Sequence, residues 1–209
     1  GNAVDAAVAT AFALAVTYPS AGNLGGGGFA VVRLQSGEVV TLDHREKAPA
    51  AAHRDMFLDE NGEVDNHLAR STLLSSGVPG SVDGLITLLQ RYGTLSLPQV
   101  IAPAIKLARD GFEIDWYVAR HFAWVRPKMI KHAASIAKFS VAGRPPKQGD
   151  IWRQPDLAST LQRISDEGRK GFYEGKTADL IVSEMQRSGG IISYEDLADY
   201  RSVWREPVK

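Results

Sequence analysis

The feature that most constrains the fold of this chain is an apolar run near its start, residues 6–16, interrupted only by Thr10. A helix needs about 20 apolar residues to cross a bilayer, so this run is too short, and we expect no membrane-spanning segment in these 209 residues. Apolar side chains on all sides of a helix are typical of a buried one. Asn2 can cap this helix, and Asp5 complements its positive end. The run therefore predicts a helix buried on most sides.

Two β-rich runs follow, residues 29–34 and 38–43, and Ser36-Gly37 between them is typical of a hairpin turn. Side chains alternate along a strand, which divides the second run into two faces. Val40, Leu42 and His44 share one face, and Val39, Thr41, Asp43 and Arg45 share the other. We expect this ribbon to leave an apolar surface, because one helix cannot cover Phe29, Val31, Val40 and Leu42 together.

The pattern of residues 78–200 predicts a mostly helical region after an irregular, polar stretch at 49–77. Helices are predicted over residues 81–92, 97–109, 115–131, 154–166 and 177–187, with a short one after Ser193. The aromatic residues at positions 116–124 predict a packing face on the third of these helices. The fold class is therefore α+β: a helix and a two-stranded hairpin in residues 1–50, followed by a mostly helical remainder.

Composition excludes several classes of function. The chain has 24 basic and 24 acidic residues, and this balance indicates no nucleic-acid partner. Cysteine is absent, and the five histidines include no pair at short ligand spacing with a carboxylate, so we expect no metal site. The four glycines at 25–28 lack the Gly-Lys-Ser/Thr of a phosphate loop. We expect no cofactor, and we interpret these glycines as backbone that passes close to another segment or a ligand.

Arg45 is the candidate binding residue. It follows the second strand between two acids, and Pro49 ends regular structure soon after. A guanidinium fixed at a strand end can hold a carboxylate through two parallel hydrogen bonds, a geometry that lysine cannot copy. The simpler alternative is a structural ion pair with Asp43 or Glu46.

Eight motifs, in colinear order from end to end, resemble the γ-glutamyltransferase family. They are residues 1–9, the glycines 25–28 before Phe29, 43–50 (Asp-His-Arg-Glu-Lys-Ala-Pro-Ala), 76–82 (Ser-Gly-Val-Pro-Gly-Ser-Val), 92–95 (Tyr-Gly-Thr-Leu), 103–112, 172–175 (Phe-Tyr-Glu-Gly) and 189–197. No single motif carries the resemblance alone. It implies that residues 1–209 are a partial large-subunit region of such a protein.

The resemblance implies an N-terminal nucleophile hydrolase with an αββα sandwich, made as a precursor that cuts itself into two subunits. The terminal threonine of the small subunit then attacks a γ-glutamyl amide such as glutathione, and the acyl group passes to water or an amino acid. The family pattern places the clamp for the substrate α-carboxylate on Arg45, with His44 replacing the usual aromatic residue. No two threonines are adjacent in the sequence, so we expect no catalytic residue here. We expect these residues alone to be inactive.

The partners implied are the γ-glutamyl substrate and the small subunit of the same precursor, and the location implied is periplasmic or secreted. Two alternatives stay open within the family: a relative resembling cephalosporin acylases, and one that processes poly-γ-glutamate. A third alternative, from another class, is a non-catalytic helical interaction domain. Arg45 distinguishes an enzyme from that last alternative, because a substrate site requires it and a scaffold does not.

Overall fold

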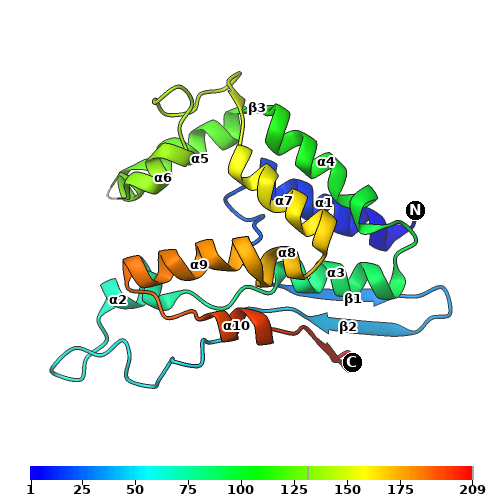
Figure 1. Ribbon diagram of the computed structural model, residues 1–209, viewed down its shortest axis with the longest axis horizontal. Helices are drawn as coiled ribbons and strands as arrows, with labels where there is room; N and C mark the ends of the chain where they lie inside the picture. Colours follow the sequence, from blue (N-terminus) through cyan, green and yellow to red (C-terminus); the bar gives the residue numbers. More distant parts are fainter. Residues whose placement is uncertain (131, 209) are drawn as a thin grey trace.

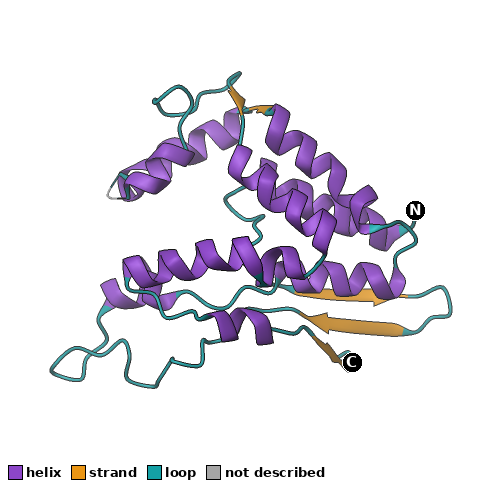
Figure 2. Cartoon of the chain, viewed as in Figure 1, coloured by secondary structure: helices purple, strands orange, loops and turns teal. Residues whose placement is uncertain are grey.

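A computed structural model describes residues 1–130 and 132–208 (Figure 1). The helices are α1 (Ala3–Thr17), α2 (Asn66–Ser71), the 3₁₀ turn η1 (Leu73–Ser75), α3 (Ser81–Tyr92), α4 (Leu97–Asp110), α5 (Trp116–Met129), α6 (Ala133–Lys138), α7 (Pro155–Glu167), α8 (Lys170–Tyr173), α9 (Gly175–Ser188) and α10 (Tyr194–Asp199). The strands are β1 (Phe29–Arg33), β2 (Val39–Asp43), β3 (Phe112–Glu113), β4 (Ile151–Trp152) and β5 (Val203–Arg205). The predicted α+β class is confirmed, and Figure 2 shows the predominance of helix.

The first helix forms as predicted. The Asn2 side chain accepts from the N–H groups of Val4 and Asp5, and the Asp5 carboxylate accepts from the Asn2 N–H, which completes a capping box. Val8, Phe12 and other apolar side chains of α1 are buried in the main core. No helix within residues 1–130 and 132–208 is long and apolar enough to span a membrane.

Within residues 1–130 and 132–208 the main sheet has three strands in the order β1-β2-β5, so the two-stranded prediction is wrong in number, and β3 pairs with β4 in a separate antiparallel ribbon. β1 and β2 form the predicted hairpin, with Phe29 opposite Asp43 and Arg33 opposite Val39. The third strand comes from the far end of the segment, and Trp204 of β5 lies opposite Leu42 of β2. β2 is the central strand, because β1 and β5 both pair with it in antiparallel orientation. Arg45, which comes two residues after β2, is therefore carried by a strand that is hydrogen-bonded on both edges.

The two faces of this sheet differ in exposure, and the register shows which apolar side chains each face carries. Leu42 is fully buried against the helices, with Ala30 opposite it on β1. Phe29 and Val31 lie on the other face, where they are 63% and 68% exposed. One helix layer therefore covers Leu42, and the apolar surface that we predicted comes from the other face, at Phe29 and Val31.

The helices stack in layers on the covered face of the sheet. α3 contacts β2, α1 contacts α3 and α4, and α4 contacts α7 (Figure 1). The α5–α6 arm has its own small core, formed by Ile114, Val118, Phe122 and Trp152. Trp116, Tyr117 and Trp124 of α5 are exposed, so the packing face predicted at 116–124 is wrong for these three residues, and of its aromatic side chains only Phe122 is buried. The predicted end of that helix, Lys131, lies outside the described residues.

Candidate functional site

The end of β2 is held by its neighbours beyond the last strand residue. His44 N–H donates to the Gly28 carbonyl at 2.9 Å, and Gly28 N–H donates to the His44 carbonyl at 3.2 Å, so the hairpin ladder continues to His44. Asp43 Oδ1 then accepts from the Arg45 N–H at 3.0 Å. Two residues further, Lys47 pairs with Val78 through main-chain hydrogen bonds of 3.1 and 2.8 Å. The backbone that carries Arg45 is therefore fixed on both sides of the residue.

The Arg45 side chain extends from this fixed backbone into solvent. It is 58% exposed, and its Nε lies 3.3 Å from Glu46 Oε2. Among residues 1–130 and 132–208 the Arg45 guanidinium donates no hydrogen bond. Asp43, the other acid proposed as a structural partner, pairs instead with Arg205 of β5 at 2.7 Å. Arg45 thus has one adjacent, part-exposed acid, a pairing that typically contributes about 0–1 kcal/mol, and its side chain is more than half exposed.

The glycine loop passes directly against this segment, as the sequence predicts. A Cβ on Gly27 would lie 2.5 Å from the His44 carbonyl oxygen and 2.7 Å from the Glu46 nitrogen. The Gly26 carbonyl accepts from the N–H groups of Gly80 and Ser81 at 2.8 and 2.9 Å, which satisfies the start of α3. The loop therefore joins the end of β2 to α3, and it can do so only without a side chain at Gly27.

His44 lies on the helix side of the same segment. A Cβ on Gly84 of α3 would approach His44 Cγ to 2.3 Å, so the imidazole packs directly against the helix at Gly84. Burial lowers the pKa of His44 more strongly than the nearby Asp43 and Glu46 raise it. The ring is therefore neutral at pH 7, and its buried Nδ1 has no hydrogen-bond partner in the described residues.

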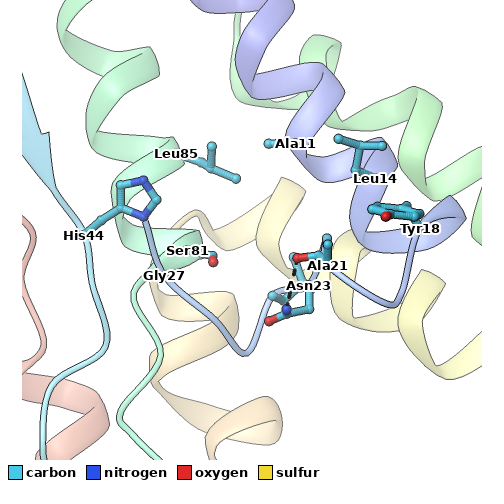
Figure 3. Close-up of a pocket in the computed structure, with 11 residues that line it drawn as sticks. Ala11, Leu14, Tyr18, Ala21, Asn23, Gly27, His44, Ser81 and Leu85 are labelled. Atoms are coloured by element: carbon cyan, nitrogen blue, oxygen red, sulfur yellow. Dashed lines mark hydrogen bonds between the residues drawn. The ribbon is translucent and has the colours of Figure 1, made fainter. Parts of the chain in front are cut away.

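A cavity of about 300 Å³ lies beside His44, between α1, the glycine loop and α3 (Figure 3). Its lining residues are Ala11, Leu14, Tyr18, Ala21, Gly22, Asn23, Leu24, Gly27, His44, Ser81 and Leu85. Arg45 is not among them. The cavity is largely apolar and is a poor match for a charged carboxylate, so Arg45 and not this cavity is the candidate for binding one.

A buried network of polar side chains supports the backbone at Arg45. The sequence pattern does not predict it, because its members lie far apart in the chain. Asp83 Oδ1 accepts from Arg169 Nε at 3.0 Å, and Asp83 Oδ2 accepts from the N–H and hydroxyl of Ser202 at 2.8 and 2.6 Å. Arg169 also donates to the Tyr200 carbonyl at 2.7 Å. The Tyr200 hydroxyl in turn donates to the Arg45 carbonyl at 2.7 Å. The network connects α3, the N-cap residue of α8 and the segment before β5 to the backbone of the candidate binding residue.

Metal ligation finds no support in residues 1–130 and 132–208, where no group of three or more His, Asp or Glu side chains could hold an ion.

A family model described as gamma-glutamyltranspeptidase matches the chain over residues 1–209. The chain belongs to the γ-glutamyltranspeptidase family. The resemblance inferred from the motifs is thereby confirmed.

Individual proteins and solved structures are also similar to this chain. The glutathione hydrolase proenzyme of Escherichia coli K12 is 47% identical over 209 residues, covering 100% of this chain and 36% of the relative. The crystal structure of Helicobacter pylori gamma-glutamyltranspeptidase is similar with a TM-score of 0.97 at 48% identity, over 99% of this chain and 60% of that one. A cephalosporin acylase from Bacillus halodurans is more distant, with a TM-score of 0.87 at 28% identity over 99% of this chain and 39% of that one. The chain thus spans about a third of the length of the E. coli relative.

Proposed function

We propose that the whole protein cleaves γ-glutamyl amides such as glutathione and passes the γ-glutamyl group to water or an amino acid. We propose further that Arg45 binds the α-carboxylate of the substrate. The observation that carries this proposal is the Arg45 guanidinium itself, which is 58% exposed on a backbone held by hydrogen bonds on both sides. The names of the relatives, which are glutathione hydrolases, support the substrate class.

The chemistry divides between this segment and the rest of the protein. Arg45 supplies the fork that takes a carboxylate through two parallel N–H···O bonds, and it thereby orients the amide several bonds away for attack. Glu46 Oε2 lies 3.3 Å from Arg45 Nε and balances part of the guanidinium charge. The nucleophile of the proposed reaction is the N-terminal threonine of a small subunit, whose own α-amine serves as its base. This segment binds and orients, and the small subunit reacts.

The proposal also covers the sandwich to which this segment belongs and the subunit that completes it. We infer that residues 1–50 supply one helix and part of one sheet of an αββα sandwich, that residues 78–200 form the helical part of the large subunit, and that the small subunit of the same precursor completes the sandwich. The exposed Phe29 and Val31 support this inference, since large apolar side chains on an open sheet face are typical of a surface that another layer covers. By family resemblance we expect the protein to be periplasmic or secreted.

The test is the kinetics of the full-length protein carrying Arg45→Lys, after gel analysis shows that it still cuts itself into two subunits. Lysine keeps the charge and loses the fork, so kcat/KM for a γ-glutamyl substrate should fall about 30- to 1000-fold, or about 2–4 kcal/mol. Arg54→Lys is the matched control, because Arg54 is also exposed and adjacent to an acid, Asp55. If kcat/KM of Arg45→Lys stays within about threefold of the wild type, Arg45 is a structural ion-pair residue.

Substrate choice separates the remaining alternatives within the family. A γ-glutamyl amide carries a free α-carboxylate and α-amine, whereas the acyl side chain of a cephalosporin need not. If the full-length protein releases the side chain of a cephalosporin faster than it hydrolyses glutathione, the acylase alternative is correct. Faster cleavage of poly-γ-glutamate than of glutathione would favour the polymer-processing alternative. Absence of turnover on all three would support a non-catalytic protein.

A further inference from the structure

The backbone of Arg45 is held from both sides by one distant segment, residues 200–205. On the N–H side, Asp43 Oδ1 accepts from Arg45 at 3.0 Å, and Asp43 Oδ2 is fixed by Arg205 Nε at 2.7 Å. On the carbonyl side, the Tyr200 hydroxyl donates to the Arg45 oxygen at 2.7 Å. Tyr200 and Arg45 are 155 residues apart in the sequence. The orientation of this one residue therefore depends on side chains that the hairpin does not contain.

Tyr200 is itself rigidly placed. Its ring is buried and stacks on Tyr173 with centroids 5.8 Å apart and planes 7° from parallel. The Lys47 ammonium lies 5.0 Å from the centroid of the Tyr200 ring. Gly80 lies close to the hydroxyl, because a Cβ at this position would approach the Tyr200 hydroxyl oxygen to 2.1 Å. The absence of a side chain at Gly80 thus gives the hydroxyl its path to the Arg45 carbonyl.

The hydroxyl keeps its proton at every pH at which such an enzyme is assayed. Burial is the largest of the effects that raise the pKa of Tyr200 to about 12, and the charges of Asp83 and Asp43 add to it. The Arg45 carbonyl is an acceptor without a proton of its own, so Tyr200 is the donor in this hydrogen bond. Phenylalanine at this position would keep the stacked ring and remove only the donor.

We propose that Tyr200 is a positioning residue for the carboxylate clamp: it acts on substrate binding through the main-chain carbonyl of Arg45 and touches no substrate. This inference rests on the proposed function of Arg45. A two-point pairing tolerates little rotation, because both N–H···O bonds must form at once. The direction in which the long Arg45 side chain leaves the backbone is set by the peptide that carries it. Freeing the carbonyl lets this peptide rotate, and the fork then spends less time in the orientation that pairs with a carboxylate.

The experiment compares Tyr200→Phe with Tyr173→Phe in the full-length protein. Tyr173 is the matched control because its buried hydroxyl also donates to a main-chain carbonyl, that of Pro79, at 2.8 Å. Tyr200→Phe should lower kcat/KM for a γ-glutamyl substrate by roughly five- to tenfold, the scale of one hydrogen bond, mostly through a higher KM. Tyr173→Phe should cost similar thermal stability and leave kcat/KM within about twofold of the wild type.

Two further measurements separate positioning from general destabilisation. With a substrate whose α-carboxylate is replaced by a carboxamide, Tyr200→Phe should match the wild type, because the fork no longer has its ligand. In an Arg45→Ala background, Tyr200→Phe should add less than about twofold, since residues acting as a unit are not additive. An equal loss on both substrates, or a full additional loss in the Arg45→Ala background, would overturn the inference.

Failure of this inference differs from failure of the proposed function. If the wild-type protein does not turn over γ-glutamyl substrates, or Arg45→Lys leaves kcat/KM unchanged, the proposed clamp is wrong and the role of Tyr200 falls with it. If Arg45→Lys behaves as expected and Tyr200→Phe equals Tyr173→Phe, the clamp stands and only the positioning role of Tyr200 is refuted.

Discussion

Replacing Asp83 by asparagine removes a negative charge from the buried network while keeping the shape of the side chain. Asp83 is 4% exposed, and each of its oxygens has its own donors, from Arg169 on one side and Ser202 on the other. A carboxylate accepts with both oxygens, whereas an asparagine amide accepts with only one. Whichever way the amide is turned, its NH₂ group faces a donor. Asp83→Asn therefore breaks one side of the network in either orientation.

The loss in the free energy of unfolding follows from the burial of the Asp83–Arg169 ion pair. Breaking a buried ion pair by removing one partner costs about 3–5 kcal/mol, because the remaining charge is left uncompensated. Arg169 keeps the carbonyl oxygens of Leu197, Ala198 and Tyr200 at 3.2, 2.8 and 2.7 Å, so we expect the lower end, about 3 kcal/mol. A cost of about 3 kcal/mol lowers Tm by roughly 6–12 °C in a unit of 150–250 residues. The shift per kcal/mol is smaller in a larger protein, so the full-length protein should melt a few degrees lower, by less than about 12 °C.

The assay is thermal unfolding of the full-length protein followed by circular dichroism, with Asp110→Asn as the control. Asp110 also contacts two basic side chains, Lys106 and Arg109, at 2.6 and 3.0 Å. It does so on the exposed surface of α4, where ion pairs contribute little, so Asp110→Asn should melt close to the wild type. Equal Tm values for Asp83→Asn and Asp110→Asn would refute the reasoning, because burial would then not matter to the pair.

Two other predictions concern the glycine loop and the start of α1. Gly27→Ala should lower kcat/KM for a γ-glutamyl substrate by roughly ten- to hundredfold, because the new Cβ displaces the backbone at Arg45; Gly25→Ala, whose Cβ meets only Asn23 Oδ1 at 3.8 Å among the described residues, should behave like the wild type, and equal kinetics for both variants would contradict the expectation. Burial alone would raise the pKa of Asp5, but hydrogen bonds from Thr94, Leu95 and Asn2 outweigh it and hold this pKa well below its usual range. A carboxyl whose pKa falls on folding stabilises the fold above its unfolded pKa of about 3.9, and this contribution is lost as the pH falls further. The wild type should therefore melt above Asp5→Asn at pH 7, and the gap should narrow below about pH 4 in matched melting curves; a gap that is independent of pH would contradict the assignment.

Local signals in the sequence are enough to place Arg45. The alternation of 38–43 predicts the strand, and the structure has β2 at Val39–Asp43 with Leu42 on the buried face. The caps of α1 and α10, at Asn2 and Ser193, are likewise readable because their partners lie three residues away. The close approach of the Gly27 backbone to His44 and Glu46 is also predictable, because residues 25–28 are four successive glycines.

Contacts between distant residues are not readable in this way. Nothing near Tyr200 indicates that its hydroxyl meets a carbonyl 155 residues earlier, and β5 is recognisable as a partner of β2 only once the chain has folded back. The relative register of β1 and β2 is also not fixed by either strand alone, and a shift of one residue exchanges the two faces, so the sequence does not show that Phe29 and Val31 form the exposed face. The short helices α2 and α6 contain too few residues for helical periodicity to identify them.

The long separation between Arg45 and Tyr200 has a consequence for the order in which the chain is made. At about 5–20 residues per second, the ribosome adds Tyr200 roughly 8–31 s after Arg45. During that interval the β1–β2 hairpin can form, because its contacts are local and hairpins close in about 1–10 μs. The Arg45 carbonyl, however, still lacks its donor, and Asp43 still lacks Arg205. The orientation of Arg45 is therefore completed only after residues 200–205 leave the ribosome, so a nascent chain that stops before Tyr200 carries the arginine without the geometry that we propose for binding a carboxylate.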